Sequence, residues 1–460
     1  MKKHISINKM IVASILLISS FLNSCDNYLE PDPSTASLTS ENVFLSDATS
    51  NSAISGMYAT IMNSNEVSSM LNGGLGVMTG LSADEIHDFN TTYQDYETNS
   101  INYSDFGPVY YHWLEAYKSI YNCNAAIIGL TDNEFVTPSV RDNLLGEVYF
   151  MRALNYFYLT NLYGAVPLIT NTDPAENKDK SRTSSDEIYN LIVSDLDLAI
   201  PLLAENYISA ERTRPNKYTA KALRARVALY LGDNVTAINE STDVINNAAT
   251  YTLSPIESVF KNTSQETIWQ LASVSWKPNA LDAHFYNPNG RPSYTITDDL
   301  LNSFEINDKR KTNWIAQYTY NSEIYNYPFK YTQTFQRPIT EYNVVFRLAE
   351  QYLIRAEAKA ATDIPGAVSD LDEIRKRADL LPYSGTLSKT AVLDAIAQER
   401  RVELFSEWGH RWFDLKRTSK IDAVLGAFKD NWKSSAQLWP IPQKEIDANQ
   451  NLNPNNEGYN

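Results

Sequence analysis

The fold is decided by the stretch QERRVELFSEWGHRWFDLKR, which occupies residues 398–417. Three of its glutamates recur at intervals of four residues: Glu399, Glu403 and Glu407. This spacing places their side chains on one face of a helix, with Arg400 and Arg411 within one turn of them. Oppositely charged side chains on one helix face usually form structural ion pairs. The stretch therefore predicts a helix whose carboxylates stabilise the structure and do not catalyse a reaction.

Apolar residues at intervals of three and four predict further helices along the chain. The clearest one follows Thr137, a candidate N-cap, and begins with Pro138; Gly164 lies beyond its end. Residues 184–187, SSDE, form a capping box for the next helix. Later helices are predicted at residues 217–231, 234–247, 346–361, 365–378 and 388–406.

Several of these helices form pairs joined by short turns, and such pairs are typical of a tetratricopeptide-like solenoid. The repeat's own sequence signature is reduced to Ala153-x-x-x-Phe157. Two regions lack the helical pattern, residues 65–111 and residues 250–343, the second rich in Asn, Pro, Thr and Tyr. Long irregular segments inside a large domain are usually functional, so we expect the ligand site there.

Composition excludes several classes of protein. The 460 residues carry 55 acids against 39 bases, a net charge of −16 that would repel a nucleic acid. Two cysteines are too few for a disulfide scaffold. Tyrosine is in excess, with 29 Tyr against 16 Phe. Because a buried tyrosine hydroxyl needs a partner, this excess indicates half-exposed surfaces with polar edges.

The N-terminus reads as a lipoprotein signal peptide over residues 1–24. Three lysines precede an apolar run at residues 10–22 that is too short to span a bilayer. The run ends in Leu22-Asn23-Ser24-Cys25, which resembles a bacterial lipobox with Cys25 as the lipidated residue. The alternative is a secretory signal cleaved near Ser24 with an incidental cysteine. If Cys25 is lipidated, residues 25–40 serve as anchor and tether, and Cys123 is left as a buried, inert thiol.

The motifs of common enzymes are missing from the sequence. It contains no His-Glu-x-x-His, no P-loop and no Gly-x-Ser-x-Gly, so it predicts no metal, no cofactor and no serine esterase. The acidic stretch at residues 84–88, DEIHD, is interpreted as a solvated loop or strand end. A glycosidase needs only two carboxylates, a signal of almost no specificity in an acidic protein.

The stretch at residues 398–417 closely resembles the hallmark segment of the SusD/RagB family of outer-membrane nutrient-binding lipoproteins, and we call it the hallmark stretch. Five other stretches are similar to the same family: RALNYF at 152–157, YGAVPL at 163–168, NDKR at 307–310, LAEQYLIRAEA at 348–358 and LWPIPQKEI at 438–446. They follow the family's order over nearly the whole chain. The tail departs from the family pattern, because Gln450 replaces its first proline.

The resemblance implies a mostly α fold, with tetratricopeptide-like helix pairs and an irregular lobe containing a few short strands. It places one globular domain at residues 41–460, with helix pairs at about 112–163, 185–247 and 346–406. It further implies a non-catalytic lipoprotein on the outer face of the outer membrane that passes oligosaccharides or polysaccharide fragments to a SusC-like TonB-dependent transporter. A peptide-binding member of the same family and a glycoside hydrolase are the alternatives.

No family motif carries the ligand contacts, so these are predicted from the chemistry of sugars, whose apolar faces stack on aromatic planes. The predicted ligand-binding residues lie in the irregular regions: Tyr93, Asp95, Tyr96, Trp276, Tyr286, Asn287, Arg291 and Trp314. Wider candidates are Phe89, Asn90, Gln94, Asn279, Asp282, His284, Asn289, Tyr318 and Tyr320. The alternating aromatics Tyr325, Tyr327, Phe329 and Tyr331 are assigned instead to a strand pair with cross-strand contacts.

Overall fold

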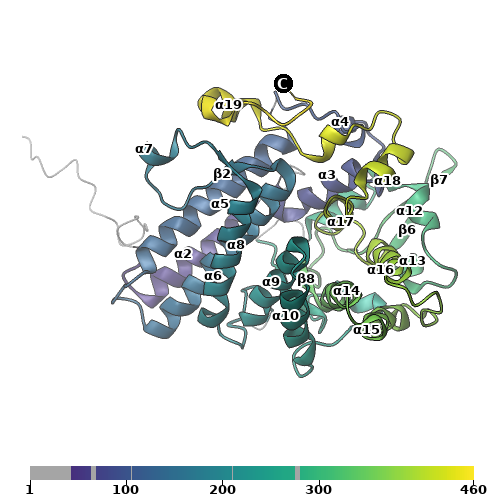
Figure 1. Cartoon of the computed structure of the whole chain (residues 1–460), viewed down its shortest axis with the longest axis horizontal. Coiled ribbons are helices and arrows are strands. Elements are labelled where there is room, and N and C mark those ends of the chain that lie inside the picture. The colour runs from purple at the N-terminus through teal and green to yellow at the C-terminus, as the bar shows by residue number, and fades with distance from the viewer. Residues whose placement is uncertain (1–42, 64–68, 105, 210, 275–279, 460) are drawn as a thin grey trace, which may run out of the picture.

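Helices dominate the computed structural model, which describes residues 43–63, 69–104, 106–209, 211–274 and 280–459 (Figure 1). The predicted mostly α fold class is confirmed. The predicted signal peptide, Cys25, the predicted tether and Trp276 lie outside the described residues. The helices are α2 (Asp47–Ile61), α3 (Leu75–Ser82), α4 (Gln94–Glu97), α5 (Pro108–Leu130), α6 (Pro138–Tyr163), α7 (Pro174–Asn177), α8 (Ser185–Leu202), α9 (Lys217–Leu231), α10 (Asn234–Asn246), α11 (Leu281–Tyr286), α12 (Asp298–Asn302), α13 (Lys309–Asn313), α14 (Leu348–Lys359), α15 (Ile364–Arg377), α16 (Lys389–Glu403), α17 (His410–Arg417), α18 (Ile421–Phe428) and α19 (Gln443–Ala448).

The long helices pack in an unbroken series of pairs. Helix α5 packs on α6, α6 on α8, α8 on α9, α9 on α10, α10 on α14 and α14 on α15. Figure 1 shows this series running from the long helices α2, α5 and α6 to the shorter α14 and α15. The arrangement is the predicted superhelix of antiparallel pairs.

The residues predicted to begin and end the helices do so in most places. Pro138 begins α6, and Gly164 ends it with φ +72°, a conformation that glycine adopts without strain. Thr137 occupies the N-cap position but does not cap the helix, because its hydroxyl donates to Asp47 Oδ2 at 2.7 Å. Ser184 caps α8 by accepting from the Glu187 backbone N–H at 3.3 Å, and its hydroxyl donates to the Glu187 carboxylate.

The helix predicted at residues 388–406 is α16, but it is shorter than expected and does not include Glu407. Helix α16 ends at Glu403, and the chain turns sharply before α17 starts at His410. Ser406, Trp408 and Gly409 adopt φ +55°, +48° and +75° in this turn, and such left-handed residues cannot continue a helix. Glu407 therefore lies in the turn, away from the helix face that carries Glu399 and Glu403.

Four two-stranded antiparallel sheets occur in the described parts of the chain, and each strand is short. The strands are β1 (Ile86–Asp88), β2 (Val166–Pro167), β3 (Arg182–Thr183), β4 (Thr267–Leu271), β5 (Tyr294–Ile296), β6 (Ile315–Tyr320), β7 (Glu323–Pro328) and β8 (Asn343–Arg347). The pairs are β1 with β5, β2 with β3, β4 with β8 and β6 with β7. The strand predicted from alternating aromatics is β7, although it ends at Pro328 and leaves Phe329 and Tyr331 outside.

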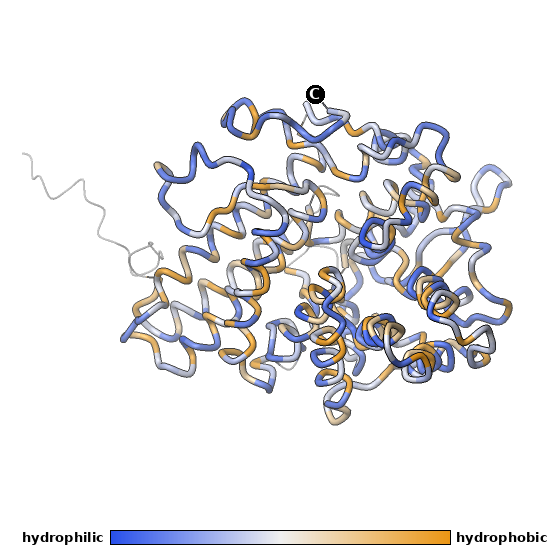
Figure 2. Tube along the Cα trace, in the orientation of Figure 1, coloured by the Kyte–Doolittle hydropathy of each residue, from blue (hydrophilic) through white to orange (hydrophobic). Residues whose placement is uncertain are grey.

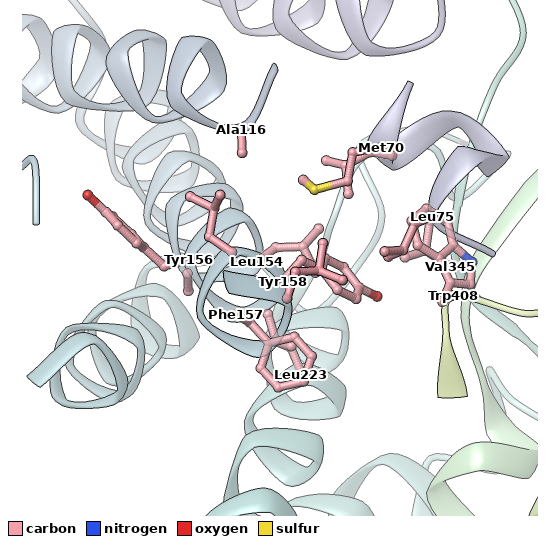
Figure 3. Close-up of a cluster of buried hydrophobic side chains, with 14 of the residues drawn as sticks. Met70, Leu75, Ala116, Leu154, Tyr156, Phe157, Tyr158, Leu223, Val345 and Trp408 are labelled. Carbon is pink, nitrogen blue, oxygen red and sulfur yellow. The ribbon is translucent and has the colours of Figure 1, made fainter. Parts of the chain in front are cut away.

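The core lies where the helix pairs meet the turn between α16 and α17, which we call the hallmark turn (residues 404–409). Figure 3 shows Leu154, Phe157 and Tyr158 of α6 packed between Leu223 of α9 and the side chains around Trp408. In Figure 2 apolar and polar residues alternate along the long helices, as expected for helices with one buried face. Cys123 of α5 is fully buried, and burial raises the pKa of its thiol to about 12. The prediction of a buried thiol is confirmed.

The carboxylates of the hallmark stretch form ion pairs, but not with the arginines predicted. Glu399 accepts from Arg310 Nη1 at 2.6 Å, and Glu407 accepts from Arg347 Nε at 2.8 Å. Arg400 and Arg411 face other acids. Arg400 Nε lies 2.7 Å from Asp414. The ion pairs therefore join elements that are distant in the sequence.

Arg411 holds the acidic stretch that the sequence assigned to solvent. Its guanidinium donates to Asp84 at 2.8 and 2.7 Å, and Arg401 donates to the same carboxylate at 2.9 Å. Asp84, Glu85 and Asp88 are 1%, 2% and 6% exposed, so the interpretation of residues 84–88 as solvated holds only for His87, although the stretch does lead into strand β1. Although burial opposes ionisation, the two arginines lower the pKa of Asp84.

Glu403 is the centre of the buried charge network. It contacts three guanidinium groups, those of Arg310, Arg347 and Arg377. Burial alone would raise the pKa of Glu403, but these three groups hold it well below its usual range. Arg347 also donates to Glu266 at 3.0 Å, so one arginine neutralises acids from three parts of the chain.

We expect Arg347→Met to lower the free energy of unfolding by about 3–5 kcal/mol, because it leaves buried carboxylates without their counter-charge. Chemical denaturation followed by circular dichroism measures the loss. Arg141→Met is the control, since Arg141 pairs with Asp142 at the surface and an exposed pair contributes about 1 kcal/mol or less. Equal stability of the two variants would show that the network does not hold the fold.

Candidate ligand-binding site

Two antiparallel strand pairs position a group of partly exposed aromatic side chains in the irregular lobe. Strand β1 pairs with β5, with Asp88 opposite Tyr294, and the Phe89 N–H extends the pair by donating to the Ser293 carbonyl at 3.0 Å. Strands β6 and β7 form a hairpin in which Tyr318 lies opposite Tyr325. Because β7 also contacts β5, the two pairs lie side by side. The hairpin lies on the opposite side of the molecule from α2, α5 and α6 (Figure 1).

An aromatic cluster forms where the two strand pairs meet, and we define it as Phe89, Tyr320 and Tyr325. The ring of Phe89 meets that of Tyr325 edge to face, with centroids 4.8 Å apart, and that of Tyr320 at 6.1 Å. All three side chains are partly exposed. The guanidinium of Arg291 lies 5.1 Å from the centre of the Phe89 ring, and this arginine is exposed. The cluster therefore presents aromatic surface beside a cation at the edge of the lobe.

Polar groups fix the cluster and give it a hydrogen-bonding rim. The Tyr325 hydroxyl donates to Glu323 at 2.6 Å, and this bond raises the pKa of Tyr325. Asp88 accepts from the Asn90 N–H at 3.1 Å and from the Tyr93 N–H, so it ties the loop that follows β1. Arg291 donates to the Phe89 carbonyl at 3.4 Å. Asn90 follows Phe89 and is exposed, so its side-chain amide can form a hydrogen bond with a ligand.

Of the seven predicted site residues that lie in the described ranges, only Arg291 belongs to this arrangement. Tyr93 lies on the loop that follows β1 and Asp95 in the short helix α4, and both are partly exposed. Asp95 accepts from the Asn102 N–H at 2.9 Å, and burial raises its pKa. Asn287 is partly buried and faces the carbonyls of Tyr331 and Thr332 at the limit of hydrogen-bond distance.

Tyr96 was predicted to stack on a ligand, and that prediction is wrong because the side chain is buried. Its hydroxyl accepts from the Val109 N–H at 2.7 Å at the start of α5. Its ring meets Trp439 edge to face at 5.2 Å. Tyr96 thus fixes a helix end and a C-terminal segment from the inside.

Tyr286 and Trp314 are also buried, so neither can serve as an exposed platform. Trp314 Nε1 donates to the Ile256 carbonyl at 3.0 Å, and Lys330 lies 4.8 Å from its ring centre. Tyr286 is 3% exposed and lies beside Asp282, where burial raises the pKa of its hydroxyl. Trp276 lies outside the described residues and stays a prediction.

Phe89 and Tyr320 were only wider candidates, and Tyr325 was assigned to a strand. That assignment is correct, but a strand position and ligand contact do not exclude one another. In a two-stranded hairpin one face can pack while the other stays exposed, and side chains alternate between them. The unusual density of aromatics in the region of the hairpin was the signal that could have identified it.

The described residues provide no metal centre at the cluster. Within these ranges no group of three or more His, Cys, Asp or Glu side chains could hold a metal ion. None of the described helices is long and apolar enough to cross a membrane. Glu399 and Glu403, the carboxylates considered for a glycosidase, are buried and paired with arginines.

Two family models match the chain, and together they cover most of it. The model described as "Starch-binding associating with outer membrane" matches residues 27–229, and that of the SusD family matches residues 321–459. Two SusD-like proteins of Formosa agariphila are 24% and 28% identical to the chain. These alignments cover 98% and 97% of this chain and 99% of each relative. The starch-binding protein SusD of Bacteroides thetaiotaomicron is 34% identical over 25% of this chain and 21% of its own.

Solved structures share the fold. A SusD superfamily protein from Bacteroides vulgatus superposes with a TM-score of 0.76 at 21% identity, covering 90% of this chain and 99% of its own. One from Parabacteroides distasonis gives 0.76 at 24% identity, with 89% and 99% covered. A laminarin-binding SusD-like protein gives 0.74 at 22% identity, with 90% and 99% covered. At these identities the similarity establishes the architecture.

We expect Tyr96→Phe to lower the free energy of unfolding by about 1–2 kcal/mol without weakening ligand binding, because it leaves the buried Val109 N–H without its acceptor. Chemical denaturation measures the first quantity and affinity electrophoresis the second. Tyr121→Phe is the control, since Tyr121 is 52% exposed on α5. Weakened binding with unchanged stability would restore Tyr96 as a ligand contact.

Proposed function

Since the chain belongs to the SusD/RagB family, we propose that it is a non-catalytic surface protein that binds oligosaccharides or polysaccharide fragments through its aromatic cluster. The observation that carries the proposal is the exposure of Phe89, Tyr320 and Tyr325 together, beside a cation and amide groups. Most of the other large aromatic side chains in the lobe pack inward.

The chemistry of the cluster suits a carbohydrate. A pyranose ring has an apolar face of C–H groups and a rim of hydroxyls, so it stacks on aromatic rings and hydrogen-bonds at its edge. The rings of Phe89 and Tyr325 supply the apolar surface. Arg291, Asn90 and Glu323 supply donors and acceptors around it. Similar proteins described as starch-binding and laminarin-binding support the same class of ligand.

The proposal includes the place of the protein in the cell. The lipobox-like sequence ending at Cys25 would attach the mature chain to the outer membrane through a lipid, facing the exterior. Residues 25–40 would form the anchor and the tether. From there the protein would capture glycan fragments and pass them to a SusC-like TonB-dependent transporter. The family description as associating with the outer membrane supports this placement.

We expect Phe89→Ala and Tyr320→Ala each to weaken glycan binding roughly tenfold, about 1.4 kcal/mol, because each removes a stacking surface from the cluster. Affinity electrophoresis of the mature chain on a panel of polysaccharides measures the retardation. Tyr121→Ala is the matched control, an exposed tyrosine on α5 far from the hairpin. Trp276→Ala belongs in the same series and tests the remaining predicted contact.

The same assay separates the alternatives. Retardation that persists in both Phe89→Ala and Tyr320→Ala would place the glycan elsewhere. Peptides found by mass spectrometry in the purified protein, with no retardation on any polysaccharide, would favour a peptide-binding member of the family. Reducing sugar released by the purified chain would contradict the non-catalytic assignment and favour a glycoside hydrolase.

We expect Cys25→Ser to move the protein from the outer-membrane fraction to the soluble fraction, because the lipidated thiol is lost. Cell fractionation and immunoblotting of the full-length chain measure the distribution. Cys123→Ser is the matched control, as Cys123 is the other cysteine and lies buried in α5. If Cys25→Ser stays in the membrane fraction, the lipid anchor is wrong.

A further inference from the structure

A large cavity lies away from the aromatic cluster, on the side of the molecule that carries α2 and α6. Its volume is about 740 Å³, within the range of ~300–1,000 Å³ for small-molecule sites. Its walls are α2, the first turns of α6, the loop between α8 and α9, and the segment that follows β4. Figure 1 shows α2 and α6 on the opposite side from the hairpin of β6 and β7. The cavity shares no residue with the aromatic cluster.

One buried ion pair holds these walls together. Arg214, in the loop before α9, donates to Glu147 of α6 at 2.5 and 2.8 Å. Arg214 Nη1 donates to the hydroxyl of Ser55 on α2 at 3.0 Å. The hydroxyl of Tyr58, also on α2, donates to Glu147 at 3.0 Å. Two helices and a loop are therefore fixed relative to one another before a ligand enters, which lowers the cost of binding one.

The lining carries no unmatched charge. Arg214 is the one charged side chain among the described residues that line the cavity, and Glu147 neutralises it. Arg212, which stands next to the lining in the sequence, donates instead to the carbonyls of Thr250 and Thr267. A charged ligand would lose water here without meeting a free counter-charge, and that loss is costly. The lining therefore favours a neutral ligand.

Hydroxyl and amide side chains surround the cavity. Those that are at least partly exposed are Asn51, Ser55, Ser139, Ser209 and Thr213. Asn51 donates its amide to the Asp47 carbonyl at 2.9 Å, so its side-chain oxygen can accept from a ligand. The hydroxyls of Ser209 and Thr213 lie 3.0 Å apart, so one of them donates to the other and the second can donate to a ligand. Hydroxyls both donate and accept, and they match a ligand whose own groups do the same.

The apolar part of the lining is aliphatic. Val140, Ile208 and Val274 line the cavity and are at least partly exposed. Tyr58 is the one aromatic side chain among the described lining residues, and it is only 8% exposed. A ligand would therefore be held by hydrogen bonds and by contacts of its C–H groups with aliphatic side chains. This mode of binding differs from the ring stacking at the aromatic cluster.

We propose that this cavity is a second carbohydrate site, which takes a short neutral oligosaccharide. The class of ligand rests on the proposed function, and the neutral charge rests on the lining. The volume is more than twice the lower limit of ~300 Å³ for small-molecule sites, which leaves room for more than one sugar ring. Two sites on opposite sides of one protein hold a long glycan more tightly than either site alone, if the chain reaches both.

Isothermal titration with maltotriose and with laminaritriose, two neutral trisaccharides, tests the proposal. The mature chain carrying both Phe89→Ala and Tyr320→Ala leaves the cavity as the remaining site. We expect at least one of the two trisaccharides to bind this double variant, with one molecule per chain. Trigalacturonate, an anionic trisaccharide, is expected to bind roughly tenfold more weakly, because its carboxylates find no counter-charge. Trialanine, a peptide, is expected not to bind.

Two further substitutions in the same double variant locate the binding. Ala59→Phe fills the cavity without removing a hydrogen bond or an ion pair, and it is expected to abolish binding of the trisaccharide. Ala423→Phe is the matched control, because Ala423 is exposed on α18. Asn51→Ala is expected to weaken binding roughly fivefold, since one hydrogen bond is lost. Asn122→Ala, at an exposed position on α5, is its control. Circular dichroism checks that every variant is folded.

The proposal is overturned if neither trisaccharide binds the double variant, or if Ala59→Phe and Asn51→Ala both leave the binding unchanged. Equal binding of trigalacturonate would show that the site does not select neutral ligands. Binding of trialanine in place of the sugars would make the cavity a peptide site.

The cavity and the aromatic cluster can fail separately. Ala59→Phe alone is expected to leave part of the retardation on polysaccharide gels, because the cluster still binds. If Ala59→Phe abolished the retardation while Phe89→Ala and Tyr320→Ala left it unchanged, the cavity would be the glycan site and the aromatic cluster would be wrong.

Discussion

The contact between Arg347 and the acids around it is the interaction on which the rest of the structure depends. Arg347 ends strand β8, and it neutralises Glu403 of α16, Glu407 of the hallmark turn and Glu266 at the start of β4. Burying so many charges costs a large desolvation free energy, which is offset only when every partner is in place. The network therefore selects one arrangement of helix, turn and strand, and a partial arrangement leaves a carboxylate buried alone.

The stretch at residues 398–417 also holds the segments around β1 and β7, which carry Phe89 and Tyr325 of the aromatic cluster. Arg411 and Arg401 fix Asp84 just before β1, and β1 leads directly to Phe89. Lys330, two residues beyond β7, donates to the Glu403 carbonyl at 2.9 Å and to the Glu407 carboxylate. The strands that present Phe89 and Tyr325 are thus tied to one charged segment in the core. The stretch at residues 398–417, whose charges have a structural role, therefore also sets the relative position of the rings that would receive a ligand.

Helices were predictable from the sequence because their signals are local, whereas the exposure of loop aromatics was not. The predicted helix at residues 217–231 coincides with α9, since apolar spacing and the glycine after it act within a few residues. Tyr96 stands between Asp95 and Glu97, and its polar neighbours indicated exposure. Its burial depends on Val109 and Trp439, and no local pattern reports contacts with residues so distant in the chain. The turn at Glu407 was missed for a related reason, because its left-handed residues include Trp408, a type that rarely adopts that conformation.

The tyrosine excess indicated half-exposed surfaces, but many of the tyrosines are buried and use their hydroxyls inside the protein. Tyr163 donates to the Val109 carbonyl at 2.6 Å, and Tyr156 donates to the Ile169 carbonyl at 2.9 Å. Each reaches from a helix to the backbone of another segment, which phenylalanine could not do. Irregular segments packed against helices leave backbone N–H and C=O groups that need hydrogen-bond partners. A tyrosine side chain fills the space with its ring and supplies the hydrogen bond with its hydroxyl. In the hairpin the same residue type meets a different demand, because Tyr325 donates to Glu323 at the surface and keeps part of its ring open. Tyrosine is therefore abundant here because an irregular lobe built on a helical superhelix needs its hydroxyl in both places.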